Sequence, residues 1–154
     1  STGDIAWFMG GQLNASVCCI DQHLATRADQ TALIWEGDEL GEVKKYTYRE
    51  LHREVCKIAN AMRASGVKKG DTVAIYMPMI PELCFVMMAC CRVGAAHSVV
   101  FAGFSAEALR DRIVYAKSKW VFTSDEGKRG GRSLPLKKIV DTACVGCEGI
   151  VEKV

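Results

Sequence analysis

The chain has 154 residues, of which 49% are hydrophobic and 25% are charged, a composition that predicts about one globular domain. No apolar run approaches the roughly 18 residues of a membrane span, and the first residues lack the basic start and apolar stretch of a signal peptide. The formal net charge of only +2 disfavours a broad nucleic-acid-binding face, so we expect neither a nucleic acid nor a membrane as partner.

In chain order, apolar residues at helical spacing first predict a helix over residues 12–27. Strands at 31–37 and 42–48 then predict a β-hairpin. The sequence TYRE at 47–50 has the capping-box pattern that begins a helix. Gly66 is expected to end that helix as its left-handed C′ residue.

From residue 71 the pattern alternates between strands and helices. The predicted elements are a strand at 72–77, a helix from Pro81 to Gly94, a strand at 97–101, a helix capped by Ser105, a strand at 119–124 and a helix at 134–144. Such a β-α-β-α-β-α series forms a parallel sheet with right-handed crossovers.

The predicted fold class is therefore α/β, with a three-layer α/β/α parallel-sheet subdomain preceded by a helix and a β-hairpin. We expect residues 1–70 to pack on the sheet and residues 71–154 to form an incomplete sheet domain. Val151 and Val154 are typical of the beginning of another strand, and the mean hydropathy of +0.07 is high for a free small domain. Both features favour a segment of a larger protein, with apolar surface that other segments cover.

Eight cysteines are spread over the chain, and several lie within apolar helical patterns. That pattern is typical of buried free thiols and not of a disulfide framework, so we expect a reducing compartment. The cytoplasm is the first expectation, and a mitochondrial or other organellar location remains open. Cys144 and Cys147 form a CxxC motif, but it closes a predicted helix and has no second ligand pair at zinc-binding spacing. We interpret it as an incidental pair and predict no metal site.

Ligands of parallel α/β sheets bind beyond the carboxyl ends of the strands. The predicted loops at 77–82, 101–105 and 124–132 occupy that edge, and the last of them reads SDEGKRGGR. Glycine lets a backbone approach a ligand, and the planar fork of arginine suits phosphate. Arg129 and Arg132 therefore predict an anion site.

Familiar nucleotide and hydrolase motifs are missing. The sequence contains no GxGxxG after a strand, no P-loop spacing, no GxSxG elbow and no HExxH helix, and its carboxylates form no obvious acid–base pair. The residues alone thus predict an anion site on an α/β scaffold, without a particular reaction.

Six longer stretches carry a more specific signal, and together they span nearly the whole chain. They are GGQLNAS, ALIWEGDE, YTYREL, GVKKGDTVAIYMPMIPE, GAAHSVVFAGFSAEALRDRI and TSDEGKRGGRSLPLKKIVD. These stretches resemble the amino-terminal part of the AMP-forming acetyl-CoA synthetases, which are adenylate-forming ligases. The stretches IWEGDE and RGGRSLPLKK favour the short-chain branch over general fatty-acyl ligases.

The resemblance implies a two-step reaction in which acetate and ATP give acetyl-adenylate and pyrophosphate, and coenzyme A then takes the acetyl group and releases AMP. It implies acetate, ATP, Mg²⁺ and coenzyme A as small-molecule partners. The family's Ser/Thr/Gly-rich phosphate loop, its ATP, acetate and magnesium sites and its catalytic lysine all lie downstream of the matching region. We therefore expect no catalytic residue in this chain, no full reaction by the chain alone, and the remainder of the polypeptide as its partner.

The same resemblance assigns part of the coenzyme A site to this chain. In the family the Arg-Gly-Gly-Arg turn contacts the 3′-phospho-ADP portion of coenzyme A, and the Phe-Ala-Gly turn lines the same site. The matching residues are Arg129, Gly130, Gly131, Arg132, Phe101 and Gly103. Phe104 is expected to pack in the core instead.

Three alternatives remain at this point. The protein is another short-chain acyl-CoA synthetase, such as a propionyl-CoA synthetase, or a stand-alone module that binds coenzyme A or another phosphoanion. The third alternative is an interaction domain whose apolar surface meets a partner chain, and a homo-oligomer is possible.

Overall fold

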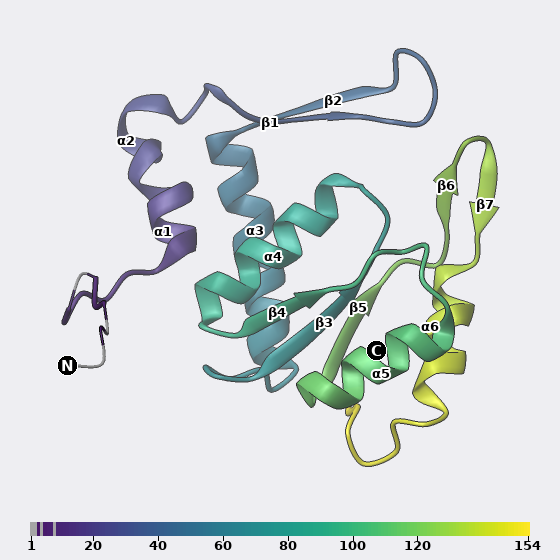
Figure 1. Ribbon diagram of the computed structural model, residues 1–154. Coiled ribbons are helices and arrows are strands. Elements are labelled where there is room, and N and C mark those ends of the chain that lie inside the picture. Colours follow the sequence, from purple (N-terminus) through teal and green to yellow (C-terminus); the bar gives the residue numbers. More distant parts are fainter. Residues whose placement is uncertain (1–2, 4, 8) are drawn as a thin grey trace.

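The computed structural model describes residue 3, residues 5–7 and residues 9–154. Residues 1, 2, 4 and 8, which belong to the predicted 1–70 unit, lie outside the described residues. The elements in chain order are α1 (Ala15–Cys19), the 3₁₀ helix η1 (Asp21–His23), α2 (Leu24–Arg27), β1 (Thr31–Glu36), β2 (Val43–Thr47), α3 (Tyr48–Ala64), β3 (Thr72–Tyr76), α4 (Pro81–Val93), β4 (Ala96–Val99), α5 (Ala106–Ala116), β5 (Trp120–Thr123), β6 (Gly127–Arg129), β7 (Arg132–Leu134) and α6 (Leu136–Cys144) (Figure 1). Within the described part of the chain, no helix combines the length and the apolar character needed to span a membrane.

A three-stranded parallel sheet forms the centre of the fold, with the order β4-β3-β5. Val73 of the central strand lies opposite His97 on one side and Trp120 on the other. The strand β3 is buried from Val73 onward because helices cover both faces of the sheet, as its unbroken apolar run predicts.

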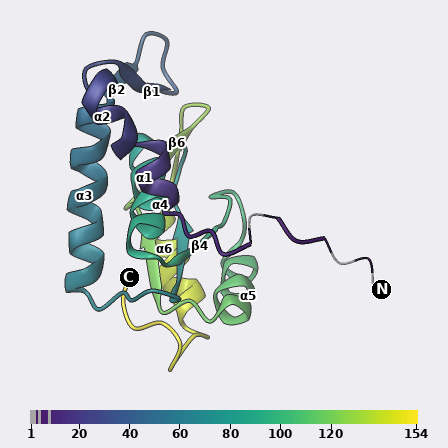
Figure 2. The same ribbon diagram turned by 90° about the vertical axis from the view of Figure 1, so that its left-hand side faces the viewer.

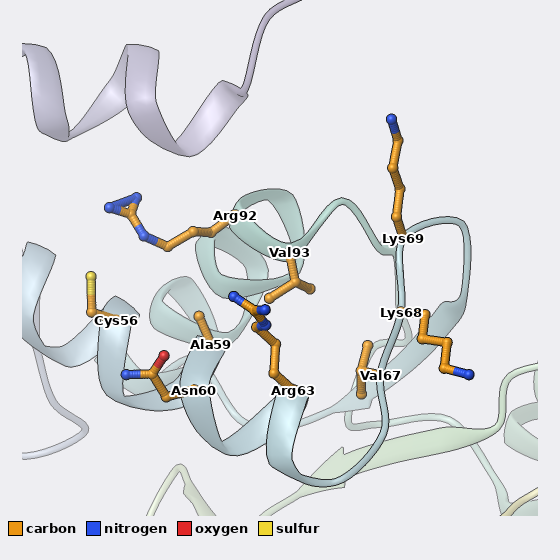
Figure 3. A pocket seen from close by; sticks show the side chains of 9 residues that line it. All are labelled: Cys56, Ala59, Asn60, Arg63, Val67, Lys68, Lys69, Arg92 and Val93. Carbon is orange, nitrogen blue, oxygen red and sulfur yellow. The ribbon is translucent and has the colours of Figure 1, made fainter.

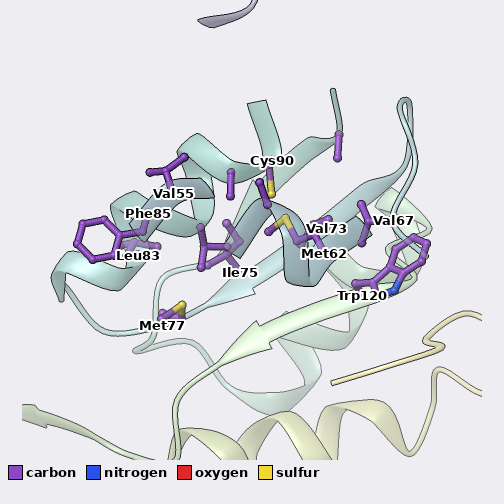
Figure 4. Packing of buried hydrophobic residues seen from close by; sticks show 14 of the residues in the cluster. Val55, Met62, Val67, Val73, Ile75, Met77, Leu83, Phe85, Cys90 and Trp120 are labelled. Atoms are coloured by element: carbon purple, nitrogen blue, oxygen red, sulfur yellow. The ribbon is translucent and has the colours of Figure 1, made fainter. Parts of the chain in front are cut away.

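The alternating side chains of β3 divide the interior into two hydrophobic clusters. Val73 and Ile75 point into a cluster that they share with residues of α3 and α4 (Figure 4). Ala74 and Tyr76 point the other way, into a cluster with residues of α5 and α6. In Figure 2, α3 and α5 lie on opposite sides of the molecule with the sheet between them. The predicted three-layer α/β/α arrangement is therefore confirmed.

Local signals place the helix ends where the sequence predicts them. Thr47 and Glu50 form a complete capping box at the start of α3, because each side chain accepts a hydrogen bond from the other's backbone N–H. Pro81 opens α4, and Gly94 ends it with φ of 79°, a left-handed conformation that glycine adopts without strain. Ser105 caps α5 by accepting a hydrogen bond from the N–H of Ala108.

The prediction of one continuous helix over residues 12–27 is wrong. Asn14 caps a shorter helix, α1, by accepting hydrogen bonds from the backbone of the next turn. The same side chain donates to the Cys91 and Arg92 carbonyls at the end of α4. The chain then breaks at Ile20, whose φ of −126° and ψ of −63° are not helical, and whose side chain inserts into the core. Tertiary contacts thus override the helical periodicity of this segment.

The last residues return to the sheet. Lys153 forms an isolated parallel bridge with Trp120, and its carbonyl accepts a hydrogen bond from the N–H of Val121. This contact lies along the free edge of β5, in agreement with the strand character predicted at 151–154.

Candidate functional site

The carboxyl ends of β3, β4 and β5 lie at one edge of the sheet because the three strands are parallel. The loop after β3, the turn at 101–104 after β4 and the hairpin β6–β7 after β5 leave the sheet at this edge (Figure 1). The structure therefore brings the predicted site residues together on the side where α/β sheets bind ligands.

Tyr76, at the end of β3, anchors the turn at 101–104. Its buried hydroxyl lies 2.7 Å from the carbonyl oxygen of Phe104 and 3.1 Å from that of Ala102. Burial raises the pKa of Tyr76, so the hydroxyl stays protonated as a donor shared between these two acceptors. Tyr76 was not among the predicted site residues, because in the sequence it reads as one more apolar strand residue.

Two phenylalanines of this turn lie on the surface. The rings of Phe101 and Phe104 meet edge to face with centroids 5.8 Å apart, and 52% of Phe101 and 41% of Phe104 are exposed. The expectation that Phe104 packs in the core is wrong, because Leu109 and Ile113 fill the interior beneath α5 and leave the ring outside. The guanidinium of Arg112 lies 4.6 Å from the Phe104 ring centroid.

The guanidinium carbon of Arg129 lies 5.3 Å from the centroid of the Phe101 ring, a cation–π arrangement. The ring edge of Phe101 lies directly over Gly103, where the Cβ of any other residue would collide with it. Phe101, Gly103 and Arg129 are thus brought together in one exposed group, although they come from two different loops.

The basic stretch, predicted as part of a loop at 124–132, forms the antiparallel hairpin β6–β7. Gly130 and Gly131 have φ of +57° and +71°, so both central residues of the two-residue turn are left-handed. That geometry is typical of the tight turns that join twisted strands and explains why two glycines stand there. The Gly-Gly pair between short polar runs was a signal that predicts this hairpin.

Arg129 and Arg132 face each other directly across the hairpin ladder. Both are exposed, and among the residues that the structure describes neither forms an ion pair with a carboxylate. Two arginine side chains at one hairpin tip can hold an anion such as phosphate through charge-assisted hydrogen bonds.

Asp38, from the loop between β1 and β2, reaches the tip of this hairpin. One of its carboxylate oxygens accepts a 3.0 Å hydrogen bond from the N–H of Gly130, and the other accepts a 2.8 Å bond from the N–H of Gly131. The two N–H groups, Gly131 first, lower the pKa of the Asp38 carboxyl, and the charge of Lys128 adds to this effect. Asp38 was not among the predicted site residues, because the two loops are more than 90 residues apart and share no local pattern.

A separate pocket of about 520 Å³ lies at the opposite, amino end of β3, between the ends of α3 and α4 (Figure 3). Its lining includes Arg63, Lys68, Lys69 and Arg92, and the guanidinium of Arg92 already pairs with the Asp21 carboxylate. None of the predicted site residues lies there, so it is distinct from the hairpin site.

All eight cysteines are free thiols, as predicted, but only Cys90 and Cys147 are fully buried. Cys147 donates a hydrogen bond to the Ala143 carbonyl, and burial raises the pKa values of both Cys144 and Cys147. Within the described residues, His, Cys, Asp and Glu side chains form no cluster of three that could hold a metal ion.

Comparisons with known proteins place the chain in a family. Residues 20–152 match the family described as AMP-binding enzyme. The chain is 61% identical over 149 residues to acetyl-coenzyme A synthetase 2 of Pseudomonas putida, and 57% identical over 148 residues to acetyl-coenzyme A synthetase of Halorhodospira halophila. It is also 59% identical over 140 residues to acetyl-coenzyme A synthetase of Vibrio cholerae.

These matches cover 97%, 96% and 91% of this chain, respectively, but only 23%, 23% and 22% of the three relatives. The chain therefore spans less than a quarter of the length of the synthetases it matches. Because the family match extends over most of the chain and includes the sheet and the β6–β7 hairpin, this protein belongs to the AMP-binding enzyme family.

Proposed function

We propose that this chain is a segment of an AMP-forming acetate–CoA ligase. In that reaction acetate attacks the α-phosphate of ATP to give acetyl-adenylate and pyrophosphate. The thiol of coenzyme A then attacks the acyl carbon, giving acetyl-CoA and releasing AMP. The proposal is supported by the three acetyl-coenzyme A synthetases that share 57–61% of the aligned residues with this chain.

Within that reaction we assign to this chain part of the coenzyme A site. The single observation that carries this assignment is the pair Arg129 and Arg132 at one hairpin tip, at the ligand edge of the sheet. Both arginines are exposed, and the guanidinium of Arg129 lies beside Phe101, so a phosphate can reach them without displacing a carboxylate from either side chain. Coenzyme A carries such a group, its 3′-phosphate.

Phe101 and Gly103 complete the proposed site in different ways. The exposed face of Phe101 offers an apolar surface to the nucleotide, and Gly103 leaves room for the ring to lie against the turn. Gly130 and Gly131 shape the hairpin tip that presents the two arginines. We propose no catalytic residue and no metal ligand in this chain, and we assign the ATP and Mg²⁺ sites to other parts of the ligase.

The cellular setting follows from the thiols. Eight free cysteines fit a reducing compartment, and we propose a cytoplasmic enzyme on that ground. A homo-oligomer remains a prediction that sedimentation of the intact ligase tests.

The reaction is tested by acetate-dependent exchange of radioactive pyrophosphate into ATP by the intact ligase. We expect exchange with acetate, weaker exchange with propionate, and thioester formation only after coenzyme A is added. The isolated 154-residue chain serves as the matched control and should show no exchange. Stronger exchange with propionate would show that propionate, and not acetate, is the preferred substrate. The absence of exchange with both acids would contradict the proposed reaction.

A further inference from the structure

The tip of the β6–β7 hairpin carries an unusual concentration of like charge. Arg129 of β6 and Arg132 of β7 are directly opposite each other, and Lys128 precedes Arg129 on β6. Like charges in directly opposed positions destabilise a strand pair. Each strand of the hairpin has only three residues, and a two-stranded hairpin is marginal without further support.

The base of the hairpin packs against the hydrophobic core, whereas the tip does not. At the base, Gly127 is buried in contact with Pro78 and Leu136. At the tip, Gly130 and Gly131 are exposed, and a Cβ built on either glycine meets no atom within 4 Å. The position of the two arginines therefore depends on contacts that the tip makes with another loop.

That loop is the one between β1 and β2, which is itself fixed beside the ligand edge. The indole Nε1 of Trp35 donates a 2.6 Å hydrogen bond to the carbonyl of Met79, in the loop after β3. Beyond this anchor, the Asp38 carboxylate binds both glycine N–H groups of the tip, and Glu39 lies 4.0 Å from Lys128. Asp38 thus supplies two acceptors and one negative charge where the hairpin has two free donors and an excess of positive charge.

We propose that Asp38 is a positioning residue that locks the hairpin tip and thereby presents Arg129 and Arg132 to the ligand phosphate. The inference rests on the proposed function, which assigns that phosphate to coenzyme A. Because the carboxylate already occupies both backbone donors, the phosphate binds through the arginine side chains and not through the glycine N–H groups.

A different role for Asp38 would change coenzyme A affinity in the opposite direction. If Asp38 were only a placeholder that the phosphate displaces, then removing it would free two donors, remove a repelling charge and tighten coenzyme A binding. If Asp38 positions the tip, its removal leaves four residues of the turn to be ordered by the ligand, and binding weakens. The direction of the change in affinity therefore decides between the two roles.

The experiment measures the dissociation constants of coenzyme A and of dephospho-coenzyme A, which lacks the 3′-phosphate, with the intact ligase. We expect Asp38→Ala to weaken coenzyme A binding by about tenfold, since several conformations of the tip replace the one locked conformation and the ligand must then order it. Asp38→Asn keeps one acceptor oxygen and should lose about threefold. The affinity for dephospho-coenzyme A should change little in either variant. Unchanged or tighter binding of coenzyme A to Asp38→Ala would overturn the proposal.

Glu39→Gln is the matched control, because it removes a neighbouring negative charge without touching the glycine N–H groups. Coenzyme A affinity should be unchanged or slightly higher in this variant. A loss of affinity equal to that of Asp38→Ala would show that the effect of Asp38 comes from net charge alone, and would contradict the proposal. Amide hydrogen exchange of the ligand-free ligase gives a second readout. Gly130 and Gly131 should exchange faster in Asp38→Ala than in the wild type, and equal exchange rates would contradict the lock.

Replacement of the arginines separates this inference from the proposed function. If Arg129→Ala and Arg132→Ala lose coenzyme A affinity while Asp38→Ala does not, the positioning role fails and the proposed site stands. If the arginine variants keep full affinity for coenzyme A, the proposed site itself fails, and the positioning of these arginines for its phosphate fails with it.

Discussion

The hydroxyl of Tyr76 lies 2.7 Å from the carbonyl oxygen of Phe104, and this contact ties the central strand of the sheet to the turn that carries Phe101. Tyr76 is buried, and the two residues are 28 positions apart. The position of the exposed aromatic pair therefore depends on a hydrogen bond made from inside the fold.

Replacing Tyr76 with phenylalanine removes that donor while keeping the ring. We expect the free energy of unfolding to fall by about 1 kcal/mol, since a buried hydrogen bond contributes roughly that much net stability. Urea denaturation measures the loss, and Tyr115→Phe is the control, because Tyr115 is 92% exposed. Equal stability of Tyr76→Phe and the wild type would contradict the role of the hydroxyl.

The same pair of proteins gives a pH test. Burial raises the pKa of Tyr76 above its ordinary value of 10.0, so its contribution is complete below pH 10 and is lost as the pH rises through the raised value. The wild type should therefore approach the stability of Tyr76→Phe in strongly alkaline solution. A stability difference that is constant across this range would show that the hydroxyl does not titrate as the buried donor.

The capping box of α3 supports a second prediction. Thr47→Val removes the side-chain oxygen that accepts from the N–H of Glu50 and should cost about 1 kcal/mol of stability. Thr26→Val, at an exposed position in α2, is the control and should change stability little. Thermal or urea unfolding at pH 7 measures both, and similar values for the two variants would contradict the capping role.

Glu50 makes the capping box sensitive to acid. The backbone N–H and then the hydroxyl of Thr47 donate to the Glu50 carboxylate and lower its pKa below the ordinary value of 4.5. Its contribution is therefore present above about pH 4.5 and lost as the pH falls through the lowered value. The stability difference between the wild type and Glu50→Ala should narrow in this acidic range, and a difference that widens there would contradict the assignment.

The thiols should separate by burial when the folded chain meets a thiol reagent. Cys19 is exposed and should react first, whereas Cys90 is buried and its pKa is raised to about 12, mainly by burial, so almost no thiolate forms at pH 8. Mass spectrometry of peptides after timed labelling locates the modified residues, and labelling in denaturant should reach all eight. Early modification of Cys90 would contradict its buried position. Stoichiometric zinc retained after dialysis against a mild chelator would contradict the interpretation of Cys144 and Cys147 as free thiols.

Much of the fold could be predicted from the sequence because its signals are local. The apolar strand at β3, the capping box at Thr47 and the proline and glycine at the ends of α4 each act within a few residues. The prediction of a helix over 12–27 was wrong because long-range contacts determine the structure of that segment. Contacts with the end of α4 cap and break that segment, and periodicity does not encode them.

The candidate site was predictable in part. The arginine and glycine content of the hairpin indicated an anion site, and the parallel sheet placed it at the ligand edge. Asp38 and Tyr76 were not predicted, because neither side chain belongs to a local motif. The hydrogen-bond partners of Asp38 lie 92 and 93 residues away, and those of Tyr76 lie 26 and 28 residues away. Asp38 and Tyr76 act through contacts between segments that are distant in the sequence, whereas the arginines and glycines of the hairpin form a recognisable local pattern.

The most direct test of the proposed site is a cycle of two proteins against two ligands. The dissociation constants of coenzyme A and dephospho-coenzyme A are measured for the wild-type ligase and for Arg129→Ala, with Arg132→Ala as a parallel series. If the arginines bind the 3′-phosphate, each substitution should weaken coenzyme A binding by about ten- to a hundredfold. The affinity for dephospho-coenzyme A, which is already low in the wild type, should fall little further in the variants. Lysine in place of either arginine should restore only part of the affinity, because it keeps the charge without the planar fork. Equal losses against both ligands would contradict the assignment of Arg129 and Arg132 to that phosphate.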